Sequence, residues 1–413
     1  MSGNDSLQPD RGVLRILDIM KGVRELRTLD AILDRLLLEA RRLVRADAGT
    51  IFLVEGDSLV FSYVHNDSLF SADDVTRYVY RDARLPIDAS SLAGHAARHA
   101  RPVVIDDAHA LPPDGDLRFN ASFDARAGYR TRAVATLPLI GLRGRVVAVL
   151  QLINPLTDAG APRRFAPDDL AVLELLADQA TAAIEAGLVT EEFILRMARM
   201  AEMRDAGETG AHVRRVGAYA AEISHALSAR EGLPTREIKR RKDMIRLAAM
   251  LHDVGKVGIT DEILGKPGPL SPDEFEAMKR HTLLGARLFS NPASEIDAAA
   301  LEVALHHHQR FDGTGYPGRV VDPFTDTVSG NPPLAGTDIP LAARITALAD
   351  VYDALVSRRV YKEPFPEEAA LAVLTRESGR HFDPRVVEAF FSIHDVILAI
   401  RQRYREQADT GTG

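Results

Sequence analysis

Apolar residues follow two different spacings in the first part of the chain. Between Val13 and Val44 they recur every third or fourth position, which is the period of an amphipathic helix. Shorter runs with the character of β-strands come next, separated by polar loops and by a helical pattern at Ser91–His99. Helices combined with mixed strands predict an α+β sandwich. The strand-like runs are Thr50–Val54, Leu59–Tyr63, Pro102–Ile105, Ala133–Ile140 and Val146–Ile153.

A single long helix is predicted from residue 168 to residue 206. Pro167 suits its first turn, and Asp168 and Asp169 oppose the positive end of the helix dipole. Its apolar stripe either packs on the preceding sheet or pairs with the same helix of a second chain. Since the part beyond Ala186 leaves the sandwich, we expect a parallel homodimer there. The stripe comprises Leu173, Leu176, Ala180, Ala183, Ile184, Leu188, Ile194 and Met197.

The chain from about Met200 to Tyr404 has an almost entirely helical pattern, which predicts an all-α domain. Loops rich in glycine and proline interrupt it, and Ser271-Pro-Asp-Glu274 is typical of a capping box that opens the helix carrying His281. The loop Val320–Pro340 is either a lid or a surface insertion, and we expect an insertion.

We therefore divide the chain at its changes of pattern. Residues 1–24 form a tail and a helix, residues 25–186 the sandwich domain, and residues 187–206 the linker helix. Residues 207–404 form the all-α domain, and residues 405–413 a disordered tail.

Composition limits the classes of protein and of site. The 413 residues include no cysteine, which excludes disulfides, thiolate zinc sites and iron–sulfur clusters. No apolar run reaches the roughly 18–20 residues that span a bilayer, and the first residues do not read as a secretion signal. We therefore expect a cytoplasmic protein without membrane insertion. The net charge of −8 argues against nucleic-acid binding, although a local basic pocket would suffice for a small anionic substrate.

Histidines and carboxylates repeatedly interrupt the apolar helices of the second half. Glu208 and His212 are four residues apart, so a helix places both on one face. His252 and Asp253 end an apolar run, where buried polar groups need partners or metal ions. Asp350 and Asp353 share one face of another apolar helix. The candidate ligands are Glu208, His212, His252, Asp253, His281, His307, His308 and Asp350.

Each candidate has an ordinary explanation when it is taken alone. Glu208 and His212 could form a surface pair, His281 could be a core histidine, and His307-His308 could belong to a solvated tract. Together the residues fit a metal cluster better, because imidazole and carboxylate are the usual ligands of hydrolytic transition metals. A cluster of two or three metal ions is a standard way to cleave a phosphodiester.

Two of these stretches carry a resemblance to a known family. His252-Asp-Val-Gly-Lys256, with His307-His-Gln-Arg-Phe-Asp-Gly-Thr-Gly-Tyr-Pro317, resembles the HD-GYP family of cyclic di-GMP phosphodiesterases, and the similarity covers roughly Met200 to Ile400. It implies an all-α HD-type domain in which the candidate ligands hold two or three divalent metal ions, iron or else manganese. Glu208 corresponds to the ligand of a third ion. His252, Asp253 and Lys256 are implied to be catalytic.

The resemblance also implies how the substrate is bound. Lys256, Tyr316, Arg359 and Lys362 match positions that contact the dinucleotide, and the GYP segment contributes in some members to binding a signalling protein. Gln309 stands where a glutamate is common, and Val360 where a proline is common. The first departure removes an acidic side chain next to His308. The second affects the placement of Arg359 and Lys362.

Residues 25–186 resemble a GAF domain, a small-ligand sensor fold. The resemblance is carried by Ala48–Val54 after a helix, by Ser90–Gly94, and by Ala148–Asn154 before Phe165–Asp168. It implies a small ligand of unknown identity or a dimerisation role without ligand. Pro155 replaces the lysine of cyclic-nucleotide-binding members. Haem or a metal could bind the domain's histidines, but we expect these to be surface residues: His65, His95, His99 and His109.

The sequence thus predicts metal-dependent hydrolysis of cyclic di-GMP to linear pGpG, with GMP as a further product, under control of the GAF sensor. A catalytically silent receptor for cyclic di-GMP that signals through a protein partner is the first alternative. Its expected mark is loss of ligand residues, and none of the candidate positions is lost. Hydrolysis of another cyclic dinucleotide is the second alternative.

Overall fold

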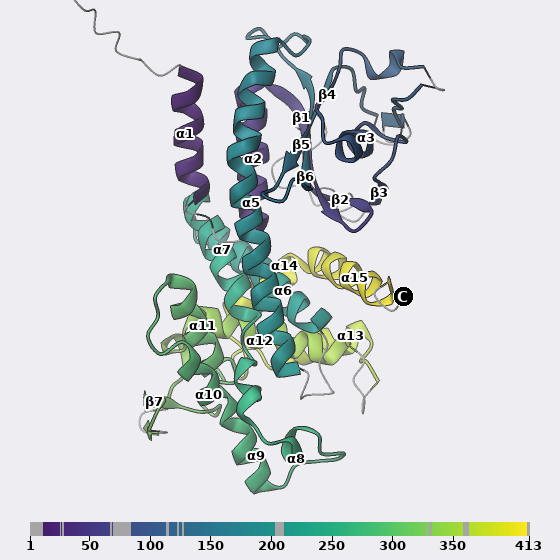
Figure 1. Cartoon of the computed structure of the whole chain (residues 1–413). Coiled ribbons are helices and arrows are strands. Elements are labelled where there is room, and N and C mark those ends of the chain that lie inside the picture. Colours follow the sequence, from purple (N-terminus) through teal and green to yellow (C-terminus); the bar gives the residue numbers. More distant parts are fainter. Residues whose placement is uncertain are drawn as a thin grey trace, which may run out of the picture. The chain divides into compact units, whose positions relative to one another are not determined.

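The computed structural model of the chain places two compact units, divided between Val189 and Thr190. Figure 1 shows their elements in sequence colours. No helix among the described residues is both long enough and apolar enough to cross a bilayer. The structure describes residues 11–24, 26, 29–66, 68, 84–112, 115–121, 124–125, 128–202, 210–325, 327–329, 333–357 and 363–410.

An antiparallel sheet with the strand order β3-β2-β1-β6-β5-β4 forms the middle of the first unit. The predicted strand runs all lie in this sheet. The edge strand β3 was not predicted, because three residues are too few for an alternating pattern. The strands are β1 Ala46–Glu55, β2 Ser58–Asn66, β3 Arg84–Pro86, β4 Val103–Ile105, β5 Val134–Ile140 and β6 Val146–Pro155.

Helices cover both faces of the sheet, so the α+β sandwich expected from the sequence is confirmed (Figure 1). Apolar residues of α2 (Leu29–Val44) and α5 (Pro167–Glu202) share one core with residues of β1, β5 and β6. On the other face, α3 (Leu92–His99) packs Ala93 and Ala97 against Phe52 and Val149. The helical stretch predicted from Val13 to Val44 is two helices, α1 (Arg11–Arg24) and α2.

Residues of the predicted apolar stripe of the long helix pack against other elements of the same chain. Leu173, Leu176, Ala180 and Ile184 belong to the core shared with α2 and the sheet. Beyond residue 186 another set of apolar side chains on α5 is exposed instead. The surface available for pairing with a second chain is therefore not the stripe that the sequence singled out.

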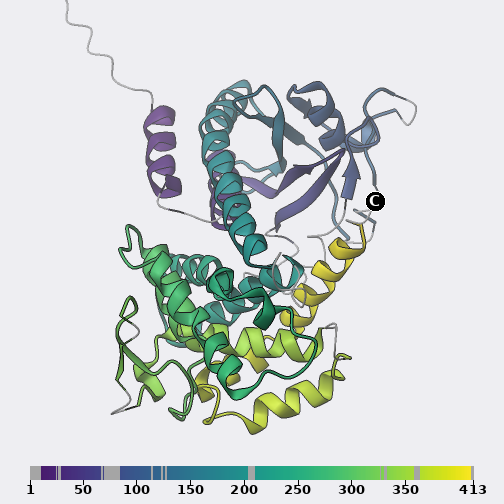
Figure 2. The ribbon, with the colours of Figure 1, turned by 60° about the horizontal axis from the view of Figure 1, so that its bottom comes forward.

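The second unit is a helical domain, seen in teal, green and yellow in Figure 2. Helix α6 packs against α7, α12, α14 and α15, and Tyr219 of α6 meets Tyr352 of α12 edge to face in the core. The predicted capping box of Ser271 and Glu274 is present. The helices are α6 Gly210–Arg230, α7 Thr235–Ala249, α8 Asp261–Leu264, α9 Pro272–Lys279, α10 His281–Leu288, α11 Glu295–His306, α12 Leu341–Val356, α13 Glu367–Arg376, α14 Pro384–Ser392 and α15 His394–Thr410.

Two short features depart from the all-helical pattern. The loop Val320–Pro340 contributes to a two-stranded hairpin of β7 (Arg319–Asp322) and β8 (Thr327–Ser329). The turn after α7 is a 3-10 segment, η3 (Val254–Gly258), which packs against α10. This second feature brings the ends of α7 and α10 together at the candidate site.

Candidate metal centre

His252 and Asp253 lie where α7 ends and η3 begins. The His252 ring is fully buried, and its Nδ1 lies 2.8 Å from the carbonyl oxygen of Ala249. A carbonyl only accepts, so Nδ1 carries the hydrogen and Nε2 of the neutral ring presents a lone pair. That Nε2 lies 3.2 Å from Oδ2 of Asp253 and 3.9 Å from Oδ1 of Asp350. The ring is thus oriented as a ligand.

His281 is the first residue of α10 rather than a mid-helix residue, as the sequence had suggested. The helix opened by Ser271 ends at Lys279, and a turn at Arg280 starts a new helix. The Nδ1 of His281 lies 2.8 Å from the carbonyl oxygen of Met278, which directs Nε2 toward Asp253. The break between the two helices therefore aims this histidine into the centre.

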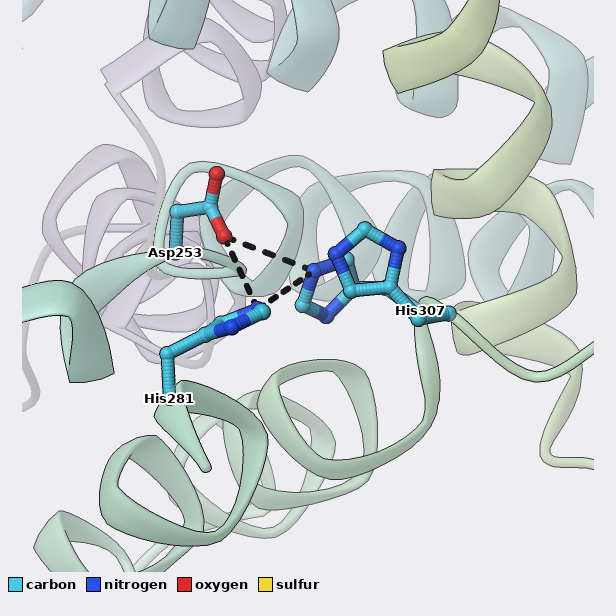
Figure 3. Close-up of side chains that lie close together, drawn as sticks. Asp253, His281 and His307 are labelled. Carbon is cyan, nitrogen blue, oxygen red and sulfur yellow. Dashed lines mark hydrogen bonds and ion pairs between the residues drawn. The ribbon is translucent and has the colours of Figure 1, made fainter. Parts of the chain in front are cut away.

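Asp253, His281 and His307 point at one another (Figure 3). Oδ1 of Asp253 lies 3.3 Å from Nε2 of His281 and 3.5 Å from Nε2 of His307, and the two Nε2 atoms are 3.5 Å apart. His307 donates its Nδ1 hydrogen to the carbonyl oxygen of Val303 at 3.0 Å. In their neutral forms both rings therefore turn lone pairs toward the same carboxylate oxygen.

This convergence fits a bound cation. Lone pairs on imidazole nitrogen and carboxylate oxygen repel one another at such distances unless a proton or a metal ion lies between them. Burial disfavours the proton: it lowers the pKa of His281 to about 4 and the pKa of His308 well below its ordinary value. Nitrogen and oxygen donors of this kind suit divalent transition metals.

The candidate ligand atoms form two groups. Asp253, His281, His307 and His308 each offer an atom within 4.8 Å of the others, and so do His212, His252 and Asp350. The groups are joined because His252 and Asp253 are consecutive, with Nε2 and Oδ2 3.2 Å apart. A carboxylate has two oxygens, so Asp253 can serve both groups at once.

Asp350 comes from the middle of α12 and faces α6. Its Oδ1 lies 3.6 Å from Nε2 of His212. On the other side of that ring, Nδ1 of His212 lies 2.8 Å from Oδ2 of Asp353. Burial opposes ionisation of Asp353, but Arg215 and His212 outweigh it and hold the pKa of Asp353 well below its ordinary value. The charged carboxylate fixes the tautomer that leaves Nε2 as a ligand.

A glycine allows η3 and α10 to meet. A Cβ atom on Gly255 would lie 1.9 Å from the carbonyl oxygen of His281 and 2.3 Å from the backbone nitrogen of Gly285. Only glycine permits backbones to approach this closely. Gly255 therefore sets the distance between Asp253, two residues before it, and His281.

The loop after α11 brings Tyr316 back over the histidines. A Cβ on Gly315 would lie 2.2 Å from the backbone nitrogen of Arg310, and the ring of Tyr316 stacks on His308 with centroids 4.7 Å apart. Gln309, which replaces the common glutamate, donates from Nε2 to the carbonyl oxygen of Gly318 at 3.1 Å. In this chain the side-chain amide of Gln309 therefore supports the loop.

Lys256 is the basic residue at the centre. Its Nζ lies 2.9 Å from Oδ2 of Asp253. Burial opposes ionisation of Asp253, but Lys256 and the surrounding histidines outweigh it and hold the pKa of Asp253 well below its ordinary value. The ammonium group thus keeps the shared carboxylate charged and places a cation beside the ligands.

The structure brings together most of the residues that the sequence selected. His212, His252, Asp253, His281, His307, His308 and Asp350 meet in the two groups, with Lys256 and Tyr316 beside them. Glu208, Arg359 and Lys362 lie outside the described residues, as does Val360. Arg215 and a role for Asp353 were not predicted from the sequence. The spacing of Asp353 from Asp350 was its only signal.

The histidines of the first unit have other surroundings. His65 is buried and lies 2.9 Å from Asp34, so it is not the surface residue that we expected, and His109 lies 2.9 Å from Asp124. The rings of His95 and His99 lie 4.4 Å apart at centroids, beside a surface cleft lined also by Arg101 and Leu117. These residues form no further metal-ligand group among the described residues.

Comparisons with known proteins match two parts of the chain to two domain families. Residues 28–184 match the model of the GAF domain, and residues 196–386 match that of the HD domain. The GAF domain and the HD-type domain expected from the sequence are confirmed.

Three curated relatives match between 51% and 59% of this chain. A cyclic di-GMP phosphodiesterase of Vibrio cholerae is 37% identical over 59% of this chain and 49% of its own length. One of Thermotoga maritima is 38% identical over 52% of each chain. The 3'3'-cGAMP-specific phosphodiesterase 2 of Vibrio cholerae is 39% identical over 51% of this chain and 36% of its own length. The chain spans about half the length, or less, of these relatives.

Proposed function

Because the chain carries a GAF domain followed by an HD domain, we propose that it is a metal-dependent phosphodiesterase that hydrolyses cyclic di-GMP to linear pGpG, and pGpG further to GMP. The observation that carries the proposal is the convergence of the Nε2 atoms of His281 and His307 on Oδ1 of Asp253. The names of the relatives support the substrate class.

Two or three divalent ions, iron or else manganese, are the proposed cofactors. His281, His307, His308 and Asp253 would hold one ion, and His212, His252, Asp350 and Asp253 another. Glu208 is the proposed ligand of a third. When bound, such ions activate water and polarise phosphate oxygens.

The residues of the chain bind and orient the substrate in this proposal. Lys256 stabilises the charge that develops on the phosphate, because its ammonium group lies beside the centre and its side chain is only 13% exposed. Tyr316, whose ring stacks on His308, contacts the dinucleotide at the edge of the centre. Arg359 and Lys362 supply further positive charge for the second phosphate or a base.

Assays of binding and of reaction products distinguish two alternatives from the proposed function. One relative is named as specific for 3'3'-cGAMP, so this dinucleotide is a second candidate substrate. A receptor that binds cyclic di-GMP and signals through a protein at the GYP loop would show binding without turnover. The complete set of described ligands favours the enzyme.

The proposal is tested with full-length protein purified without oxygen, with metal content measured on the same sample. We expect cyclic di-GMP to be cleaved, with two or three iron or manganese ions per chain, and Asp253→Asn to lose at least about 100-fold in turnover. The exposed Glu388 offers the control Glu388→Gln, which removes a carboxylate far from the ligands in sequence. Full activity in Asp253→Asn would refute the proposed centre.

The regulatory part of the proposal concerns the first unit and α5. A small ligand of the GAF domain, still to be identified, acts through the linker helix on a homodimer in the cytoplasm. We keep the domain limits at 25–186, 187–206 and 207–404. The exposed apolar residues on α5 beyond residue 186 support pairing of that helix. Equal activity of the full chain with the GAF ligand bound and with the GAF domain empty would refute the coupling.

A further inference from the structure

Helix α9 carries an unusual group of side chains on one face. Phe275 and Lys279 are four residues apart, and the Nζ of Lys279 lies 4.9 Å from the centroid of the Phe275 ring. The same Nζ lies 2.6 Å from Oε1 of Glu276. Phe275 is 46% exposed, and no residue of α9 is buried. An aromatic surface, a cation and a carboxylate therefore stand together in reach of solvent.

This group borders the metal centre. The ring of Phe275 lies 6.3 Å from that of Tyr316, and the Nζ of Lys279 lies 5.5 Å from the Tyr316 centroid. Tyr316 in turn stacks on His308, and its ring lies 6.5 Å from that of His281. A continuous path of rings thus leads from the ligands to α9.

The chemistry of the group matches one nucleobase. A base needs an aromatic surface for stacking, which the exposed part of Phe275 offers. Guanine presents the acceptor O6 next to the donors N1–H and N2–H on one edge. An ammonium group only donates and a carboxylate only accepts, so the adjacent Lys279 and Glu276 complement that edge. Adenine presents a donor at N6 and an acceptor at N1, which is the opposite order.

We propose that Phe275, Glu276 and Lys279 form a guanine subsite of the centre and set its preference for guanine over adenine. Phe275 stacks on the base, Lys279 donates to O6, and Glu276 accepts from N1–H and N2–H. This inference rests on the proposed hydrolysis of a cyclic dinucleotide. It adds residues that the HD-GYP resemblance did not mark in this sequence.

The test compares cyclic di-GMP with cyclic di-AMP on the full-length, metal-loaded protein. The ratio of kcat/KM for cyclic di-GMP over cyclic di-AMP is measured, together with the ratio of their association constants by calorimetry, taken in the same order. We expect Lys279→Met to lower both ratios at least about tenfold, Glu276→Gln to lower them in the same direction, and Lys279→Arg to restore most of the preference.

Lys266→Met is the matched control. Lys266 forms an ion pair with Glu274 at the start of the same helix, and that pair has no aromatic neighbour among the described contacts. This variant also loses a positive charge and an ion pair, but it should keep the wild-type ratios. The subsite is refuted if Lys279→Met leaves both ratios unchanged or if Lys266→Met lowers them equally.

Failure of the subsite and failure of the proposed hydrolysis give different results. Turnover of cyclic di-GMP that is indifferent to Lys279→Met and Glu276→Gln refutes the subsite and leaves hydrolysis standing. Binding that prefers guanine through Lys279, without turnover, supports the subsite and refutes hydrolysis. A wild-type protein that neither binds nor cleaves either dinucleotide refutes both.

Discussion

Asp353 lies 2.8 Å from Nδ1 of His212, on the side of the ring opposite Asp350. Arg215 holds the same carboxylate through two hydrogen bonds, of 2.6 Å to Oδ1 and 2.8 Å to Oδ2. The charge of Asp353 is therefore compensated, and its position is fixed by two side chains of α6. Such a carboxylate behind a metal-binding histidine orients the ring and raises its basicity.

The first prediction follows from this contact. Asp353→Asn should lower metal affinity about 10–100-fold, because the ring of His212 loses its charged partner. The matched control is Asp383→Asn, since Asp383 is also buried and forms an ion pair with an arginine, Arg344, but touches no candidate ligand among the described residues. Metal titration and thermal unfolding on both variants separate the effects. Equal metal affinity in Asp353→Asn and wild type would contradict the role.

The second prediction concerns the close approach of η3 and α10. Gly255→Ala should destabilise the second unit by about 1–3 kcal/mol or more, because its Cβ would lie 1.9 Å from the carbonyl oxygen of His281. Metal content should fall too, since Asp253 and His281 separate. In the control Gly265→Ala the new Cβ would lie 3.1 Å from the carbonyl oxygen of Asp261. Equal free energies of unfolding in urea for Gly255→Ala and Gly265→Ala would rule out a steric requirement for glycine at position 255.

The sequence singled out most of the residues that the structure brings together, because their chemistry is local. Asp253 and His252 interrupt an apolar run, and such an interruption is visible without a structure. What the sequence could not supply is the direction of each ring. The Nδ1 contacts to the carbonyls of Ala249 and Met278 depend on how α7 and α9 end, and helix ends are poorly marked by apolar periodicity.

The same limit explains the differences in the fold. His281 was expected inside a helix because apolar residues continue past it, yet α9 ends at Lys279. Along α5 the period alone could not tell which apolar residues the sheet and α2 would take, and so which would stay exposed. Arg215 had no signal of its own, because a charged residue on a helix is usually solvated.

The third prediction assigns Lys256 to the phosphate. Lys256→Met should reduce turnover about 100-fold, as loss of one group that stabilises transition-state charge does, while bound metal stays at the wild-type level. Lys256→Arg keeps the charge beside Asp253 and should retain more activity. If Lys256→Met loses metal as well as turnover, the lysine acts through the carboxylate of Asp253 instead.

The fourth prediction concerns stability at acidic pH. Burial, together with Arg310, lowers the pKa of His381 from 6.5 to about 4. Below pH 6.5 the unfolded chain therefore takes up this proton more readily than the folded chain, and stability falls as the pH falls from about 6.5 to about 4. Below that window the loss is complete. Above it the neutral ring contributes fully.

His381→Gln isolates this effect. The backbone oxygen of residue 381 still accepts from Phe311 in the variant, so the support of the loop is kept. The difference in the free energy of unfolding between wild type and variant should therefore change between pH 6.5 and pH 4, and it should be constant above pH 7. Parallel stability curves over the whole range would show that the ring is protonated without cost.

The last prediction tests pairing of the linker helix. On α5, Val189, Phe193 and Met200 are 69%, 63% and 61% exposed, and their spacings of four and seven residues place them on one face. An exposed apolar stripe at this spacing fits the seam of a parallel two-helix pair. Phe193→Glu should convert a dimer to a monomer in analytical ultracentrifugation, since charges there would be desolvated and would repel each other. Arg199→Glu, on an exposed flank of the same helix, should leave the dimer intact. A wild-type chain that stays monomeric at tens of micromolar would show that this face has another use, and regulation through a paired linker would then be excluded.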